Sequence, residues 1–146
     1  MPAKTVTTLG PLVGDFTEEF VRHTRGELAG QLVELRPFQR AILDGLFELN
    51  PAGLWKHRQG LVILPRKSGK SLLLSGVATW ALFASNEPGC EVYCVAASKD
   101  QARIVFQNIK DTVEADPDLS DVAEVYKDAI AVPSTGAVCR VLSSDG

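Results

Sequence analysis

The sequence predicts an α/β fold with three layers and a mostly parallel sheet. A short apolar run at residues 61–64 has the length and composition of a buried parallel strand. Residues 71–85 are too rich in leucine and alanine to form a loop, so they predict a helix. A second apolar run at residues 91–97 follows a turn and predicts the next strand. Strand, helix and strand in this order form a right-handed βαβ crossover.

The N-terminal part, residues 1–36, is expected to form a leader and a short helical segment. Prolines and glycines interrupt the first fifteen residues, which predicts a loose leader. Thr17 is a suitable N-cap for a short helix that runs to His23, with two glutamates in its first turn. Residues 32–35 are expected to be briefly extended.

A longer helix is predicted from Pro37 to about Asn50. Proline suits the first turn of a helix, and Asn50-Pro51 is a stop signal. The apolar residues between them recur at helical spacing: Phe38, Ile42, Leu43, Leu46 and Phe47.

The C-terminal part is expected to contain a helix, an acidic loop and a terminal β-hairpin. Ser98 is a suitable N-cap and Gln101 is its capping-box partner, so a helix is predicted to begin there. Residues 114–128 are rich in acidic side chains and predict a solvated loop with a turn of helix. Residues 129–132 and 137–142 are apolar runs on either side of a Pro-Ser-Thr-Gly turn, which predicts the hairpin.

Length and composition predict one domain in a soluble, cytoplasmic protein. The chain has 146 residues, of which 45% are hydrophobic, and this is enough for one core. The net charge of −3 does not indicate permanent attachment to nucleic acid by bulk charge, and transient or local contact remains compatible with it. The three cysteines are an odd number and are expected to be reduced and structural. The longest apolar helix is too short to span a bilayer, and neither histidine has a ligand partner at metal-binding spacing.

The sequence from Leu64 to Ser71, Leu-Pro-Arg-Lys-Ser-Gly-Lys-Ser, is a partial phosphate-binding loop (P-loop). In such a loop, backbone N–H groups and a helix N-terminus surround the β-phosphate, the lysine spans the terminal phosphates and the hydroxyl holds Mg²⁺. The full pattern has a glycine where this chain has Leu64. The strand, the loop and the helix follow one another in the required order, which favours a P-loop NTPase-like domain. The alternative is a basic surface turn before a core helix.

Four blocks, taken in order, resemble the N-terminal part of the large terminase subunit of tailed bacteriophages. A P-loop without its first glycine is common in that family, so Leu64 fits the resemblance. The resemblance covers nearly the whole chain. Its blocks are Arg22-His-Thr-Arg-Gly-Glu-Leu-Ala-Gly30, Leu35-Arg-Pro-Phe-Gln39, Pro65-Arg-Lys-Ser-Gly-Lys-Ser71 and Ala96-Ala-Ser-Lys-Asp-Gln-Ala102.

The resemblance implies a role for each residue of the loop. Lys70 would contact the β- and γ-phosphates of ATP, and Ser71 would ligate Mg²⁺. Arg66 resembles a loop arginine that senses or stabilises the γ-phosphate, which would make Arg66 and Lys70 the catalytic residues. The alternative is that Arg66 packs outside the loop. Lys67, Ser68 and Gly69 would donate hydrogen bonds from their backbone N–H groups to the phosphates. Pro65 would complete the part of the loop that surrounds them.

Gln39 resembles the glutamine that reads adenine in these motors and in related helicases. Its amide offers a donor and an acceptor, which suits the edge of an adenine. The alternative is a glutamine on a helix surface that contacts no ligand. Phe38 could stack on the base, although core packing is the expected use of this side chain.

The resemblance also implies a motor that drives double-stranded DNA into a procapsid. Its partners would be the portal or procapsid, the small terminase subunit and further copies in a homo-oligomeric ring. The location would be the host cytoplasm, with a virus or prophage as the source. Residues 37–146 would be the N-terminal portion of the ATPase domain, incomplete at the C-terminus and without the nuclease domain. No apolar strand ending in acidic residues follows the loop, so hydrolysis by this chain alone is not expected.

Two other functions remain compatible with these residues. One is a non-catalytic nucleotide-binding remnant, or a module that another polypeptide completes. The other is a fragment of a helicase-like P-loop ATPase, which Gln39 favours and the block from Arg22 to Gly30 disfavours.

Overall fold

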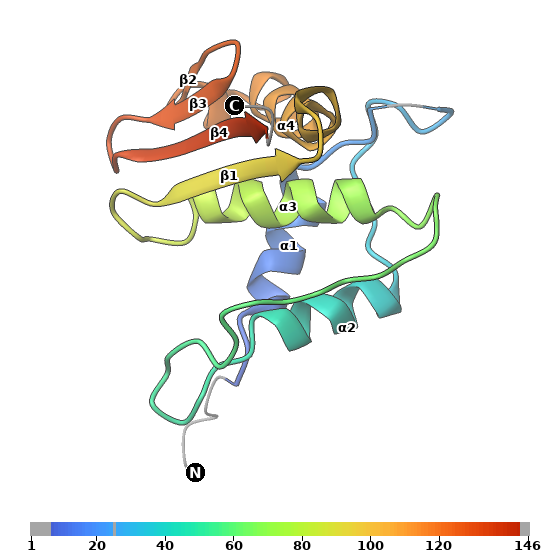
Figure 1. The fold of residues 1–146 in the computed structure, drawn as a ribbon, viewed down its shortest axis with the longest axis vertical. Coiled ribbons are helices and arrows are strands. Elements are labelled where there is room, and N and C mark those ends of the chain that lie inside the picture. Colours follow the sequence, from blue (N-terminus) through green and yellow to red (C-terminus); the bar gives the residue numbers. More distant parts are fainter. Residues whose placement is uncertain (1–6, 25, 144–146) are drawn as a thin grey trace.

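The computed structural model describes residues 7–24 and 26–143 of the chain. In this part, three helices come first, and one strand, two helices and three strands follow, so the predicted α/β class is confirmed (Figure 1). The elements are α1 (Gly10–Phe20), α2 (Pro37–Leu46), α3 (Lys70–Phe83), β1 (Glu91–Ala96), α4 (Lys99–Ala115), α5 (Pro117–Ser120), β2 (Glu124–Val125), β3 (Ala129–Val132) and β4 (Ala137–Ser143).

The sheet has four strands in the order β1-β4-β3-β2. It is mixed and not mostly parallel as predicted, since β1-β4 is a parallel pair and the other two described pairs are antiparallel. Strands β3 and β4 form the predicted antiparallel hairpin, with Ala131 opposite Val138. Strand β4 then pairs in parallel with β1, where Cys94 lies opposite Val141. Because the crossover from β1 to β4 passes through α4, this helix is placed against the sheet.

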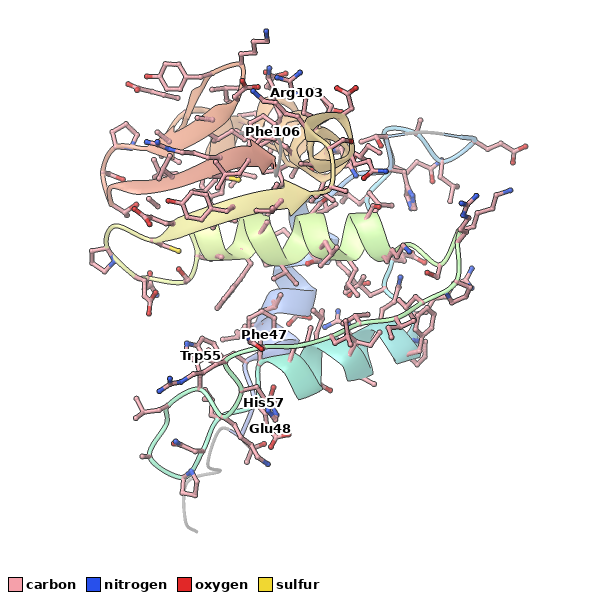
Figure 2. The ribbon with its side chains drawn as sticks, in the orientation of Figure 1. Phe47, Glu48, Trp55, His57, Arg103 and Phe106 are labelled. Atoms are coloured by element: carbon pink, nitrogen blue, oxygen red, sulfur yellow. The ribbon has the colours of Figure 1, made fainter. Side chains whose placement is uncertain are left out.

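The main core lies between the sheet and the helices α3 and α4. Alternate residues of β1 and β4 point toward the helices, which buries Cys94 and Cys139. Helix α4 contributes Phe106, which is 2% exposed and lies between the helix and the strands (Figure 2). Ser98 caps this helix as predicted, since its side chain accepts a hydrogen bond from the backbone N–H of Gln101.

A second core joins α1 and α2 to the other side of α3. It contains Val13, Leu43 and Trp80, all of which are buried. Below α3, the ring of Phe47 lies between Trp80 and Trp55, with centroid distances of 5.3 and 5.6 Å (Figure 2). The layers therefore run from the sheet through α3 and α4 to α1 and α2 (Figure 1).

The predicted strand at residues 61–64 is wrong. This segment is extended but belongs to no strand of the described sheet, and β1 pairs with β4 instead. Leu61 is 86% exposed and Ile63 is 82% exposed. Apolar composition favours burial, but a strand also needs a neighbour that satisfies its N–H and C=O groups. The predicted βαβ crossover through α3 is therefore not formed in the described part of the chain.

The first helix begins earlier than predicted. Residues 1–6 of the predicted leader lie outside the described residues, but α1 already starts at Gly10. The proline after this glycine is a loop signal in the sequence, but proline is also tolerated in a first helical turn. The Thr8 hydroxyl accepts a hydrogen bond from the N–H of Gly10 at 3.0 Å. Thr17 is not an N-cap but an interior residue, and its hydroxyl donates to the Val13 carbonyl.

Helix α2 ends at Leu46, four residues before the predicted stop. Its C-cap, Phe47, leaves the helical conformation and packs against Trp80. Glu48 and Leu49 then make isolated antiparallel bridges, so tertiary contacts override the helical pattern. Among the described helices, none combines the length and the apolar character that crossing a membrane requires.

Candidate functional site

The turn before α3 has the backbone conformation of an anion-binding loop. Lys67 and Gly69 have positive φ values of 63° and 81°, and the helix starts at the next residue, Lys70. When consecutive residues alternate between right-handed and left-handed backbone conformations, their N–H groups point toward one place. The dipole of a helix N-terminus adds positive potential there. The turn therefore offers a concave set of donors to a negative group.

Ser68, at the centre of this turn, has a side chain that lacks a protein partner. Its Oγ atom is buried and has no hydrogen-bond partner within the described part of the chain. A buried hydroxyl without a partner is costly, and a ligand that hydrogen-bonds it removes that cost. Ser68 also lines the cavity described below, so the orphaned hydroxyl lies at a place where a ligand fits.

Gln39 connects α2 to this turn. Its side-chain oxygen accepts a hydrogen bond from the N–H of Arg36 at 2.8 Å, and its Nε2 donates to the carbonyl of Ser68 at 3.3 Å. Gln39 is 8% exposed, so the alternative of a free glutamine on the helix surface does not hold. The side chain holds the start of α2 and the turn together.

A cavity of about 760 Å³ lies where these segments meet, within the size range of small-molecule sites. Four of the predicted site residues line it: Gln39, Lys67, Ser68 and Gly69. Phe38 also lines the cavity and is 41% exposed, so its expected use in the core is wrong. Phe38 is the second residue of α2, and its neighbour Gln39 is the buried residue of this first turn.

The other predicted site residues lie around this cavity and not in its lining. Lys70 lines a smaller apolar groove of about 210 Å³ between α2 and α3. Ser71 lines a polar cavity of about 450 Å³ that also contains Asp111 of α4. Pro65 and Arg66 are exposed and line none of these three cavities.

Positive charge is concentrated at the turn. Arg66, Lys67 and Lys70 are exposed, and none of them takes part in an ion pair within residues 7–24 and 26–143. Unpaired cations next to a helix N-terminus favour an anion. The same part of the chain contains no cluster of three or more histidine, cysteine or acidic side chains that could hold a metal ion.

Sequence reasoning did not find that a further segment faces the turn. Residues 21–24 and 26–33, hereafter the arm, form a narrow antiparallel loop in which Arg22 is paired with Leu32. Several residues of the arm line the 760 Å³ cavity opposite the turn: His23, Leu28, Gln31, Leu32 and Val33. The two glycines at positive φ, Gly26 and Gly30, were the available signal for a tight chain reversal.

In this α/β fold, Gly69 ends the turn and Lys70 and Ser71 begin helix α3. The sequence Gly-Lys-Ser at a helix N-terminus places the chain in the class of P-loop-like proteins. The comparisons with known proteins narrow this class. Residues 37–146 match the model of the family described as terminase large subunit, ATPase domain, and the chain belongs to this family. This membership favours the terminase interpretation over a helicase-like ATPase.

Two further matches reach beyond residues 37–146, since each covers 95% of this chain. The chain is 29% identical over 143 residues to the large terminase subunit of Enterobacteria phage HK97, covering 95% of this chain and 27% of that protein. The crystal structure of the HK97 bacteriophage large terminase superimposes with a TM-score of 0.80 at 25% identity and covers 95% of this chain and 28% of that one. The chain thus spans about a quarter of the length of these relatives.

Proposed function

We propose that this chain is the ATP-binding part of a motor that packages double-stranded viral DNA into procapsids. The observation that supports this function best is the meeting of the turn at 67–69, Gln39 and the arm around one cavity of about 760 Å³. A nucleoside triphosphate combines an anionic end, which matches the turn, with a flat base, which matches the rest of the lining.

In this proposal the backbone N–H groups of Lys67, Ser68 and Gly69 bind phosphate oxygens. The buried Ser68 hydroxyl gains a hydrogen-bond acceptor when the nucleotide is present. Lys70 and Arg66 are exposed and unpaired, and their long side chains reach the terminal phosphates from outside the cavity lining. Ser71 holds Mg²⁺, for which oxygen atoms are the preferred ligands.

Gln39 has a second role in this proposal besides holding the turn. Its two hydrogen bonds to Arg36 and Ser68 use one donor and one acceptor position of the amide. The amide retains a second N–H and a second lone pair. These remaining positions are suited to the polar edge of adenine. Binding of the base would then be coupled to the position of the phosphate loop.

The further partners of the motor belong to the same proposal. Large terminase subunits act on double-stranded DNA with a portal or procapsid and a small subunit, and we propose the same partners, in a homo-oligomeric ring, for the protein that carries this chain. The location of this work would be the cytoplasm of the infected cell. The family assignment and the relatives from phage HK97 support this part of the proposal.

Calorimetry with Mg·ATP tests the proposed function. The unaltered chain should bind Mg·ATP, and Lys70→Ala should weaken this binding at least tenfold, since each lost contact of a cation with phosphate is worth about 1.5–3 kcal/mol. Lys127→Ala is the matched control, because Lys127 is also an exposed lysine but lies on the loop before β3. Equal affinities for all three proteins would contradict the proposed function.

A further inference from the structure

The arm is a built element and not a loose connection. The N–H of Val33 donates to the Val21 carbonyl at 2.9 Å, and the N–H of His23 donates to the Gln31 carbonyl at the same distance. Arg22 ties the turn of the arm by donating from its guanidinium to the carbonyl of Gly30. The base of the arm is fixed in the protein, since Val21 is fully buried and Val33 is 5% exposed.

A second contact fixes the arm to α4. The hydroxyl of Thr24 donates to the side-chain oxygen of Asn108 at 3.0 Å, and Asn108 is itself buried in the helix packing. The arm is therefore held at both its base and its middle, on the side of the molecule where α2 and α3 begin (Figure 1). An element with this many contacts can present side chains to a ligand at low entropic cost.

Three of the arm residues that line the cavity are apolar, Leu28, Leu32 and Val33, and two are polar, His23 and Gln31. Leu28 is 51% exposed and Leu32 is 43% exposed, and both line the cavity together with Phe38. These three large apolar side chains lie around a buried amide, that of Gln39. Exposed apolar side chains that converge on one cavity with a few polar groups are typical of ligand sites.

Two parts of the cavity lining differ in chemistry. The turn offers backbone donors and the hydroxyl of Ser68. Leu28, Leu32 and Phe38 offer apolar surface. A phosphate chain alone would use only the first part. A heteroaromatic ring that is linked to a phosphate chain uses both, because its faces are apolar and its edge is polar.

We propose that the arm is the base-binding wall of this nucleotide site, with Leu28 and Leu32 contacting the purine ring and Phe38 completing the apolar lining. This inference rests on the proposed function, since it requires that the turn at 67–69 binds phosphate. It adds that residues ahead of the part of the chain that matches the family model belong to the site and set its preference for a nucleotide over a simple polyphosphate.

The test compares two probes, Mg·ATP and inorganic tripolyphosphate, which carries the same phosphate chain without a base. The double variant Leu28→Ala/Leu32→Ala should bind Mg·ATP about tenfold more weakly than the unaltered chain, because contact with a base is generally worth a factor of this order. Its affinity for tripolyphosphate should not change. The matched control is Leu54→Ala, since Leu54 is a similarly exposed leucine (65%) outside the cavity lining.

Each outcome of this experiment is informative. An unaltered chain that binds neither probe would overturn the proposed function and the role of the arm together. Equal affinity of the double variant and the unaltered chain for Mg·ATP would overturn the role of the arm alone, and so would an equal loss for both probes. A second measurement needs no substitution: Mg·ATP, but not tripolyphosphate, should slow hydrogen exchange of the His23 and Gly30 amides. Equal protection by both probes would also contradict the arm's role.

Discussion

The close packing of α1 on α3 predicts opposite effects for the same substitution at two helical glycines. A Cβ atom added at Gly76 of α3 would lie 2.3 Å from Thr17 Oγ1 and 2.7 Å from Thr17 Cγ2. A Cβ atom added at Gly45 of α2 would meet no atom within 4 Å. We therefore expect Gly76→Ala to destabilise the protein and Gly45→Ala to stabilise it.

The expected magnitudes follow from two opposing contributions. Replacing glycine by alanine inside a helix lowers the free energy of the folded state by up to about 1 kcal/mol. At Gly76 the steric cost is greater, at about 3 kcal/mol, because overpacking in a rigid core costs about 1–3 kcal/mol. Thr17 cannot turn away easily, since it is fully buried and its hydroxyl donates to the Val13 carbonyl at 2.8 Å. Gly76→Ala should therefore lower the free energy of unfolding by about 2 kcal/mol.

Thermal unfolding followed by circular dichroism measures this difference. For a chain of this size the loss corresponds to a fall in Tm of roughly 6–8 °C, while Gly45→Ala should raise Tm by roughly 3 °C. Combining Gly76→Ala with Thr17→Ala should recover about 1–2 kcal/mol relative to the sum of the single effects, because the two closest atoms are removed. A Tm for Gly76→Ala at or above that of the unaltered chain would refute the reasoning.

Three further predictions concern the loop, an ion pair and the thiols. Gly69→Ala should lower the free energy of unfolding by about 1–2 kcal/mol, because φ at this position is +81°; an unchanged denaturation midpoint would speak against the left-handed turn. The hydrogen bond from Arg103 holds the pKa of Asp128 below its ordinary value, so this pair stabilises the fold above the unfolded-state pKa of about 4 and loses its effect as pH falls through the lowered folded-state pKa. The Tm difference between the unaltered chain and Asp128→Asn should accordingly be present at pH 7 and shrink under acidic conditions, and a difference independent of pH would contradict this role. The contact with the Cys94 sulfur and burial raise the pKa of Cys139. A thiol reagent should therefore modify half-buried Cys90 first and Cys139 only on unfolding. Equal rates of modification at all three cysteines would show that the reagent reaches this core in the folded protein.

The elements that local sequence signals specify were predicted well. Helix α4 followed from its serine cap and its apolar face, and the hairpin of β3 and β4 followed from a turn between two apolar runs. Neither signal says which strand lies next to the hairpin. The parallel pairing of β4 with β1 joins residues more than forty positions apart, and only the three-dimensional structure reveals it.

The incorrect predictions share one physical cause, which is that burial depends on partners that local composition does not name. The run at 61–64 has the composition of a buried strand but finds no neighbour in the described sheet. Gly10 and its following proline have the composition of a loop, yet α1 packs against α2 so closely that a Cβ atom at Gly10 would meet Asp44 at 2.3 Å. Composition alone does not separate a glycine that breaks a helix from one that allows close packing.

The candidate site divides in the same way. The turn before α3 was visible as a tripeptide pattern, because the backbone conformation of such a turn requires glycine at a fixed position. Gln39 was identified as a candidate, but its burial and its two hydrogen bonds depend on how α2 meets the turn. The block from Arg22 to Gly30 was part of the family resemblance but gave the arm no role, and the contribution of Leu28 and Leu32 follows only from their place in the cavity lining.

The exposed segment that precedes the turn at 67–69 has a practical consequence for work with this protein. Leu61 and Ile63 are largely exposed to solvent, and so is Val95 of β1, an edge strand of the sheet in the described part of the chain, at 64%. Unpaired extended segments with apolar side chains invite association between copies at high concentration. A single charge at one of these positions, for example Ile63→Lys, interrupts this association without touching either core. Concentrated samples for crystallisation or NMR spectroscopy would therefore benefit from changing this surface before any other.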